Sequence, residues 1–157
     1  MPSEIVCPRN ILRLEKAQSC QEIVDCVDLY LSISPDVPVD RAYTIRFMTE
    51  AAKRQQFFRL IRLGEELVGW FLAKEIGLGH TQAKTFQQMY YMTNLTGVRA
   101  VKAVILAHEA IEDRACELGM EIVASTASHN DPAFVLTRIL EKQGWTRRGY
   151  YAFKLLV

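Results

Sequence analysis

The chain has 157 residues, of which 50% are hydrophobic and 24% are charged, and its formal net charge is +1. This length and balance are typical of a single globular domain, here residues 1–157, with a sizeable buried core. A charge this close to neutral gives no global field that would recruit nucleic acid or an anionic membrane. No apolar run approaches the roughly 20 residues that cross a bilayer, so we expect no membrane partner.

The four cysteines indicate a reducing environment. None of them forms a CxxC pair, and no histidine lies at metal-finger spacing from them, so we expect no metal. Cys26 and Cys116 fall on apolar helical positions, which predicts reduced core residues. Glu4, Pro8 and Arg9 interrupt any leading apolar run, so no signal-peptide pattern is present. We therefore expect a cytoplasmic protein.

The first third of the chain predicts one short strand and two helices. The strand is expected at residues 11–14, and Ser19 with Glu22 forms a capping box that begins the first helix. Asp40 can cap a second helix that runs to about Arg54. The inward residues of this second helix are predicted to be Tyr43, Phe47, Met48 and Ala51.

Three strands follow. Residues 57–63 and 67–76 are β-rich and are joined by a Gly-Glu-Glu turn at 64–66, which predicts a hairpin. Gly69 lies inside the second of these strands. Residues 85–94 are rich in aromatic side chains and methionine, and they predict a further strand.

The last part of the chain alternates helices with strands. The longest helix is predicted from about Arg99 to Leu118, followed by a strand at 121–126 and a helix that begins at Pro132. Residues 145–157 supply one or two closing strands. The apolar stripe of the long helix is predicted to be Val101, Val104, Ile105, His108, Ile111, Ala115 and Leu118.

This order of elements defines the fold class. Antiparallel hairpins come first and crossover units come later, an arrangement typical of mixed sheets. We therefore predict an α/β protein with a mixed, mostly antiparallel central sheet and helices on both faces.

Two local patterns resemble a known family. Residues 66–70, E-L-V-G-W, resemble the hairpin phrase "dG-x-x-V-G-(aromatic)" of the Gcn5-related N-acetyltransferase (GNAT) superfamily. Residues 130–133 and 140–145, N-D-P-A and L-E-K-Q-G-W, resemble the family signature "N-x-x-A-x-x-x-Y-x-x-x-G-(F/W)". The resemblance implies a GNAT-like fold in which acyl-CoA, most simply acetyl-CoA, lies between two splayed parallel strands.

The resemblance also implies where the cofactor would bind. In the family, pyrophosphate lies on the N-terminus of the long helix in a (Q/R)xxGx(G/A) turn, where free amides and the helix dipole favour an anion. Here Arg99 takes the first position, and Lys102 and Val104 take the small ones. Lys102 can pair with a phosphate, or the two side chains can close the site. The implied cofactor contacts are Met92, Thr93, Asn94, Arg99, Ala100, Lys102, Ala103, Val104 and Asn130.

The residues that would move protons depart from the family pattern. The tyrosine that serves as general acid in the family falls on Leu140, which cannot donate a proton. His129, Ser125 and Tyr90 are the candidates nearest to that position, and Glu75, at a strand end, is a candidate base. His108 lies on the apolar stripe of the long helix, which favours a core histidine.

These patterns lead to one function and two alternatives. The expected activity is transfer of an acyl group from acyl-CoA to the primary amine of a small molecule or protein. An alternative is a catalytically inactive GNAT-fold binding or assembly module, of a kind that phages or mobile elements can encode. A third is a nucleic-acid adaptor that uses Arg147 and Arg148. A homodimer is common in the family, and the strand near residues 150–156 is a candidate for pairing between chains.

Overall fold

The computed structural model describes residues 11–33, 38–54, 56–77, 82–126, 135–148 and 151–156. The order of elements follows the sequence prediction, with two closing strands. In chain order they are β1 (Leu12–Glu15), α1 (Cys20–Ile33), α2 (Arg41–Lys53), β2 (Phe57–Leu63), β3 (Glu66–Ile76), β4 (Thr85–Thr93), α3 (Gly97–Glu117), β5 (Ile122–Thr126), α4 (Val135–Lys142), β6 (Thr146–Arg148) and β7 (Tyr151–Leu155).

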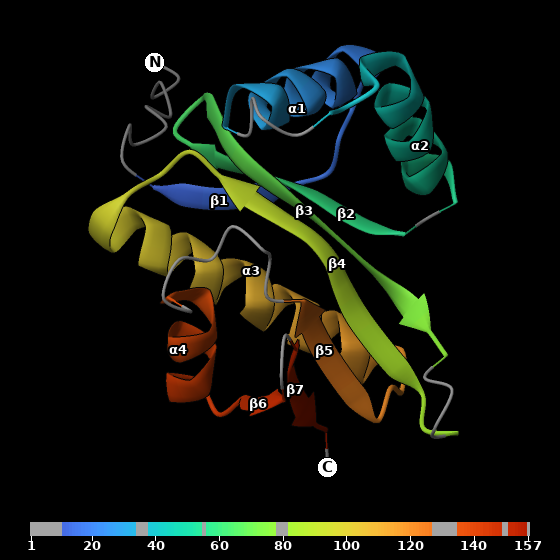
Figure 1. Cartoon of the computed structure of the whole chain (residues 1–157), viewed down its shortest axis with the longest axis vertical. Coiled ribbons are helices and arrows are strands. Elements are labelled where there is room, and N and C mark those ends of the chain that lie inside the picture. The colour runs from blue at the N-terminus through green and yellow to red at the C-terminus, as the bar shows by residue number, and fades with distance from the viewer. Residues whose placement is uncertain are drawn as a thin grey trace, which may run out of the picture.

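The strands of the described residues form one seven-stranded sheet in the order β1-β2-β3-β4-β5-β7-β6 (Figure 1). Only the β4–β5 pair within it is parallel, and the other five pairs are antiparallel. The predicted mixed, mostly antiparallel sheet is therefore confirmed. Within these residues, no helix combines the length and apolarity that crossing a membrane would require.

Helices cover both faces of the sheet, as the sequence predicted (Figure 1). Helices α1 and α2 pack on one face, over a core that includes Leu60, Trp70 and Leu72. Helices α3 and α4 pack on the other face, over a core that includes Phe71 and Ala73. Neighbouring residues of β3 thus point to opposite cores, as the pleat of a strand requires.

Short-range hydrogen bonds explain where the early helices begin. Ser19 Oγ accepts from the backbone N–H of Glu22 at 3.3 Å, so the predicted capping interaction is present at α1. Asp40 caps α2 by accepting from the backbone N–H of Tyr43 at 2.9 Å. The β2–β3 hairpin turns at Gly64, whose φ of 61° lies in the left-handed region that favours glycine.

Helix α2 buries a narrower face than the sequence predicted. Met48 and Ala51 are buried, but Tyr43 is 60% exposed and Phe47 is 38% exposed. The prediction that Tyr43 and Phe47 point inward is therefore wrong. Apolar spacing identifies a stripe on a helix, but the neighbouring elements decide how much of that stripe is covered.

Helix α3 buries a stripe that is rotated from the predicted one. Its buried residues are Ala103, Val104, Ala107, His108, Ile111 and Ala115. Val101 and Leu118, predicted to be inward, are 38% and 41% exposed, and Cys116, predicted to be a core residue, is exposed. The buried alanines lie four and eight residues apart and so share one side of the helix, which means that the face with the smallest side chains packs on the sheet. Cys26 is buried as predicted.

Candidate functional site

The strands β4 and β5 part in the middle of the sheet. Their parallel ladder covers four pairs and ends at Gln88 with Ser125. Strand β4 continues to Thr93 beyond the end of this ladder (Figure 1). Met89 is the extra residue of a β-bulge opposite β3. A bulge bends its strand and increases its twist, so residues 89–93 leave the side on which β5 had paired.

The parted segment of β4 presents backbone groups toward the opening. The N–H of Asn94 donates to the carbonyl oxygen of Val68 at 3.0 Å, which makes that pair a hydrogen-bonded one. In an antiparallel ladder such pairs alternate with non-bonded ones. The pair Gly69–Thr93 follows next in the register, and Tyr91 lies two residues further along β4. The alternation therefore directs the N–H and C=O of Tyr91 and Thr93 away from β3.

Gly69 allows β3 to approach this segment closely. A Cβ built on Gly69 would lie 2.4 Å from the carbonyl oxygen of Met92, a distance that no side chain tolerates. Thr93 adds a further tie between the strands, because its Oγ1 donates to the carbonyl oxygen of Val68 at 2.8 Å. The edge of the opening is thus fixed to the rest of the sheet.

Helix α3 begins directly after this segment, at Gly97 rather than at the predicted Arg99. Gly97 has a φ of 61°, and a Cβ placed there would meet no atom within 4 Å. The N-cap residue Thr96 makes no side-chain capping bond, and the first turn contains no acidic residue. The first-turn amides and the helix dipole therefore create an environment that favours an anion.

The predicted phosphate residues point in different directions from this helix. Arg99 and Lys102 line one hollow of about 500 Å³, together with Leu12 and Leu63 of the β1–β2 edge. Ala103 and Val104 are instead buried in the core between α3 and the sheet. The structure thus brings Arg99 and Lys102 together at the surface and places Ala103 and Val104 on the opposite, buried side of α3.

Three buried polar side chains, His108, Ser125 and Gln88, contact one another at the point where β4 and β5 part. His108 of α3 places Nδ1 2.9 Å from the carbonyl oxygen of Val104 and Nε2 3.1 Å from Ser125 Oγ. Ser125 Oγ lies 2.7 Å from Oε1 of Gln88. A carbonyl only accepts, so Nδ1 carries a hydrogen, and burial lowers the pKa of His108 to about 4, which leaves the ring neutral. His108 is therefore a core histidine, as predicted, and it ties α3 to both strands.

Tyr91 lies beside this group on the same face of the sheet. Its ring centroid is 5.6 Å from that of His108, and the ring of Trp145 lies 5.5 Å from His108. The Tyr91 hydroxyl is buried, and no described residue makes a hydrogen bond with it. Burial raises the pKa of Tyr91, so its hydroxyl stays protonated. Sequence reasoning missed Tyr91 because the bulge at Met89, which sets its direction, leaves no sequence signal.

The predicted proton-transfer residues do not form one cluster. Tyr90 is 47% exposed and contacts Phe47 and Trp70 on the α1–α2 face, with centroid separations of 6.2 Å in both cases. Glu75 is exposed near the end of β3, and the pleat places it on the face of the sheet that α3 and α4 cover. His129 and Asn130 lie outside the described residues. Leu140, at the family's tyrosine position, is buried between α4 and α3.

Comparison with known proteins relies on structure, because no known family profile and no curated protein matches this sequence. A Desulfovibrio desulfuricans protein assigned to the GNAT acetyltransferases superimposes with a TM-score of 0.69 at 11% identity, covering 94% of this chain and all of its own. An N-acetyltransferase from Staphylococcus aureus gives 0.69 at 10% identity, covering 94% and 98%.

A third solved structure, from Salmonella typhimurium, is of a protein assigned as an acetyltransferase and contains acetyl-CoA. It gives a TM-score of 0.66 at 10% identity and covers 94% of both chains. All three cover nearly the full length of both partners, so the agreement extends over the whole sheet and its helices. This chain therefore has the GNAT acetyltransferase fold.

Proposed function

We propose that this protein is an N-acyltransferase, most simply an N-acetyltransferase, that moves an acyl group from acyl-CoA to a primary amine. The observation that carries the proposal is the opening between β4 and β5. Their ladder ends at Gln88 and Ser125, and β4 then presents backbone groups beside the start of α3. One of the structures with this fold was solved with acetyl-CoA, which supports the assignment of the opening to that co-substrate.

The described residues offer contacts for both ends of such a co-substrate. The backbone groups of Tyr91 and Thr93 face the opening and can pair with the amides of a pantetheine arm. The first turn of α3 can hold the pyrophosphate through its amides, and Arg99 and Lys102 stand on the same helix end. Asn94 uses its N–H on Val68, so its predicted contact would involve other atoms.

The proposed reaction needs an amine, an oriented thioester and a proton donor. The neutral amine attacks the thioester carbonyl in a ternary complex, and the carbon–sulfur bond then breaks to release a thiolate. Leu140 cannot protonate that thiolate, so we assign this role to the Tyr91 hydroxyl, which is protonated and lacks a described partner. Glu75 remains the predicted candidate for removing the proton of the ammonium, and His129 and Tyr90 remain predicted alternatives for the proton donor.

The alternative function is a binding or assembly module that keeps the fold and has lost catalysis. The observation that favours it is the absence of small residues at Lys102 and Val104 and of a tyrosine at Leu140. Against it, Val104 is buried in the core, so its side chain does not fill the first turn of α3. Binding of acetyl-CoA separates the two functions.

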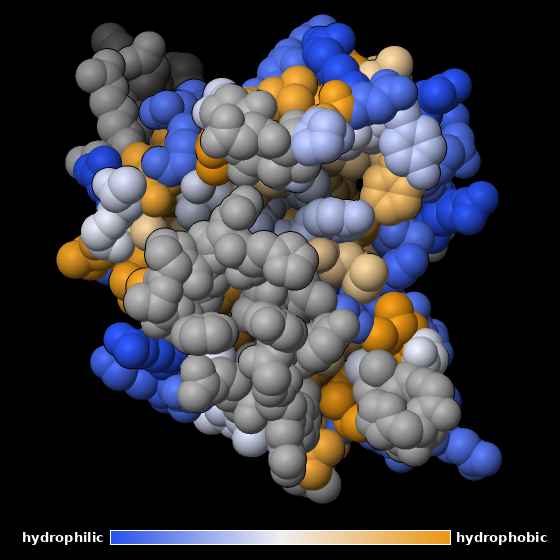
Figure 2. Space-filling view, viewed as in Figure 1, coloured by the Kyte–Doolittle hydropathy of each residue, from blue (hydrophilic) through white to orange (hydrophobic). Residues whose placement is uncertain are grey.

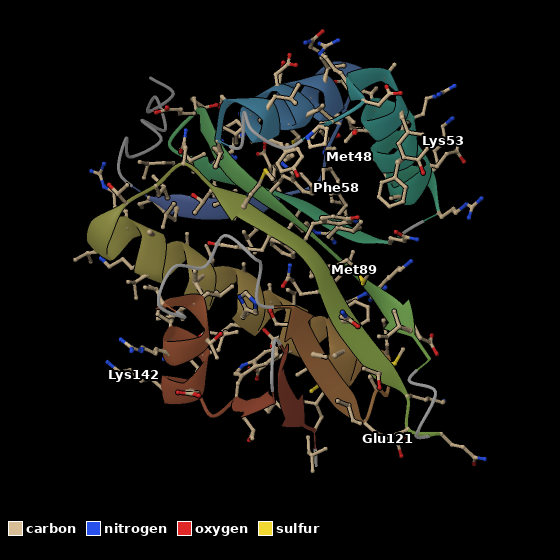
Figure 3. All side chains as sticks on the ribbon, viewed as in Figure 1. Met48, Lys53, Phe58, Met89, Glu121 and Lys142 are labelled. Atoms are coloured by element: carbon tan, nitrogen blue, oxygen red, sulfur yellow. The ribbon has the colours of Figure 1, made fainter. Side chains whose placement is uncertain are left out.

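The test is calorimetric titration of the purified protein with acetyl-CoA. We expect micromolar binding, and we expect Lys102→Glu to weaken it by about tenfold, because the substitution reverses a charge near the phosphates. Lys142→Glu is the matched control, since it changes the net charge equally at the far end of α4 (Figure 3).

Each outcome of this titration has a meaning. Binding that Lys102→Glu weakens and Lys142→Glu does not would support the proposed site. Binding that neither variant changes would show that the protein binds acetyl-CoA but that its phosphates do not lie near Lys102. A folded protein that does not bind acetyl-CoA would overturn the proposed function and favour the inactive module.

A further inference from the structure

Three aromatic side chains reach the surface in a row that leads to the opening of the sheet. Tyr43 and Phe47 lie one turn apart on α2, and Phe47 meets Tyr90 edge to face at a centroid distance of 6.2 Å. Tyr90 continues the row to the buried ring of Trp70. At the α2 end of the molecule, hydrophobic residues reach the surface among hydrophilic ones (Figure 2).

This exposure matters because the row does not belong to the core. Met48 and Ala51 are the residues through which α2 buries itself, whereas Tyr43, Phe47 and Tyr90 are 60%, 38% and 47% exposed. Aromatic rings that gather at a surface hollow commonly provide the apolar wall of a ligand site. We call one such hollow the α2 pocket; its lining residues are Tyr43, Arg46, Phe47, Glu50, Ala51, Arg54 and Gln56.

The charges of the α2 pocket are unbalanced. Among the described residues, neither Arg46 nor Arg54 makes an ion pair, whereas Arg13, Arg41, Arg62 and Arg114 all do. The carboxylate of the pocket, Glu50, lies 3.7 Å from Nζ of Lys53, which offsets its charge. The pocket therefore keeps a positive charge that is complementary to an anion. A planar guanidinium fits a carboxylate particularly well.

The position of the pocket connects it to the proposed reaction. Phe47, one of its walls, touches Tyr90, and Tyr90 directly follows the bulge residue Met89 at which β4 leaves β5 (Figure 3). The pocket has a volume of about 320 Å³, at the low end of the range for small-molecule sites. The contact between Phe47 and Tyr90 thus places one wall of the pocket beside the segment of β4 that leaves β5.

From these observations we infer that the acyl acceptor is a small primary amine that carries both an aromatic ring and a carboxylate, and that it binds in the α2 pocket. The ring packs on Tyr43 and Phe47, beside Tyr90, and the carboxylate pairs with Arg46 and Arg54. This inference rests on the proposed acyltransferase function for the fate of the amine, but the binding itself does not require turnover.

The experiment uses four probes that separate the two recognition elements. L-Phenylalanine has the ring and the carboxylate, L-phenylalaninamide has the ring alone, L-alanine has the carboxylate alone, and ethylamine has neither. Direct binding is measured by calorimetry with and without CoA, and acetyl transfer is measured as release of the CoA thiol. We expect phenylalanine to bind at least tenfold more tightly than each of the others.

Variants of the pocket test which residues confer this preference. Arg46→Gln together with Arg54→Gln should weaken phenylalanine binding about tenfold and leave phenylalaninamide unchanged, because only the former carries a carboxylate. Phe47→Ala should weaken both probes that carry a ring. The control is Arg138→Gln, which removes an exposed arginine on α4, beyond the opposite face of the sheet.

The outcomes distinguish this inference from the proposed function. Arginine-dependent binding of phenylalanine by a protein that neither binds acetyl-CoA nor transfers an acetyl group would support the pocket and overturn the acyltransferase. Acetyl transfer at the same rate to all four probes, unchanged in the variant with Arg46→Gln and Arg54→Gln, would support the acyltransferase and overturn the inference. The inference also fails if phenylalanine binds no better than ethylamine in a protein that binds acetyl-CoA.

Discussion

At the scale of single residues, Leu140 and Tyr91 decide which side chain can serve as a proton donor. The position that the resemblance to GNAT proteins aligns with a tyrosine holds a buried leucine in the core between α3 and α4. Tyr91, on β4, brings a phenol to the same face of the sheet, with its hydroxyl buried and without a described partner. A buried polar group without a partner is costly, which favours a partner that arrives with the ligand.

Replacing Tyr91 by phenylalanine tests its role as proton donor. We expect Tyr91→Phe to lower kcat by about 100-fold, a typical contribution of general acid catalysis, while acetyl-CoA affinity stays the same. The measurement is steady-state kinetics alongside calorimetry. Tyr30→Phe, which removes a hydroxyl from α1, is the control. Equal kcat values for Tyr91→Phe and the unchanged protein would exclude this residue as the donor.

At the scale of elements, the close packing of β3 against β4 holds the edge of the opening. The register pairs Gly69 with Thr93, and the carbonyl of Met92 occupies the space that a Cβ on Gly69 would need. The E-L-V-G-W phrase therefore has a physical reason for its glycine. The absence of a side chain permits a backbone approach, and the φ angle of Gly69 plays no part in this requirement.

Adding one methyl group at this position tests that account. Gly69→Ala should lower the free energy of unfolding by about 2 kcal/mol, because the strands must move apart to accommodate the new carbon. Gly77→Ala is the matched control, since a Cβ at Gly77 meets nothing within 4 Å. Urea denaturation of the two variants measures the difference. Similar stabilities for both would show that β3 and β4 adjust at little cost.

At the scale of the whole molecule, polar side chains connect the sheet to the helices on each face. Arg62 of β2 forms ion pairs with Glu15 of β1 and with Glu22 of α1, the latter at 2.8 Å. On the other face, the buried group of His108, Ser125 and Gln88 connects α3 to β5 and β4. Both connections join segments that are distant in the sequence, so they form only when the fold is complete.

His108 makes the stability of the whole fold depend on pH. Its pKa is lowered by burial to about 4 from an ordinary 6.5, so below pH 6.5 the unfolded chain binds a proton that the folded chain does not. Stability is complete above pH 6.5 and falls as the pH decreases to about 4, by roughly 3 kcal/mol in total. Tyr91, which contacts His108, stays protonated throughout this range.

The measurement is the free energy of unfolding at several pH values for the unchanged protein and for His108→Gln. The difference between their two curves isolates this histidine from the other titrating groups. We expect the variant to lose less stability than the unchanged protein between pH 7 and pH 4. Parallel curves would show that His108 takes up a proton in the folded state as readily as in the unfolded state.

The sequence by itself determined the order of elements, the hairpin at Gly64 and the helix starts at Ser19 and Asp40. These features depend on periodicity, capping side chains and turn residues, which act between residues close together in the sequence. The fold class followed from that order. The likeness of the chain to GNAT proteins was also visible in two short phrases, and the structural comparison confirms the fold they implied.

Only the tertiary structure decided which faces are covered and which residues meet. The exposure of Tyr43, Phe47 and Cys116 depends on how far neighbouring elements extend over a helix, and no local pattern records that distance. The opening depends on a bulge at Met89 and on where β5 stops pairing. These are contacts between segments far apart in the chain, and their geometry arises from packing rather than from the propensities of either segment.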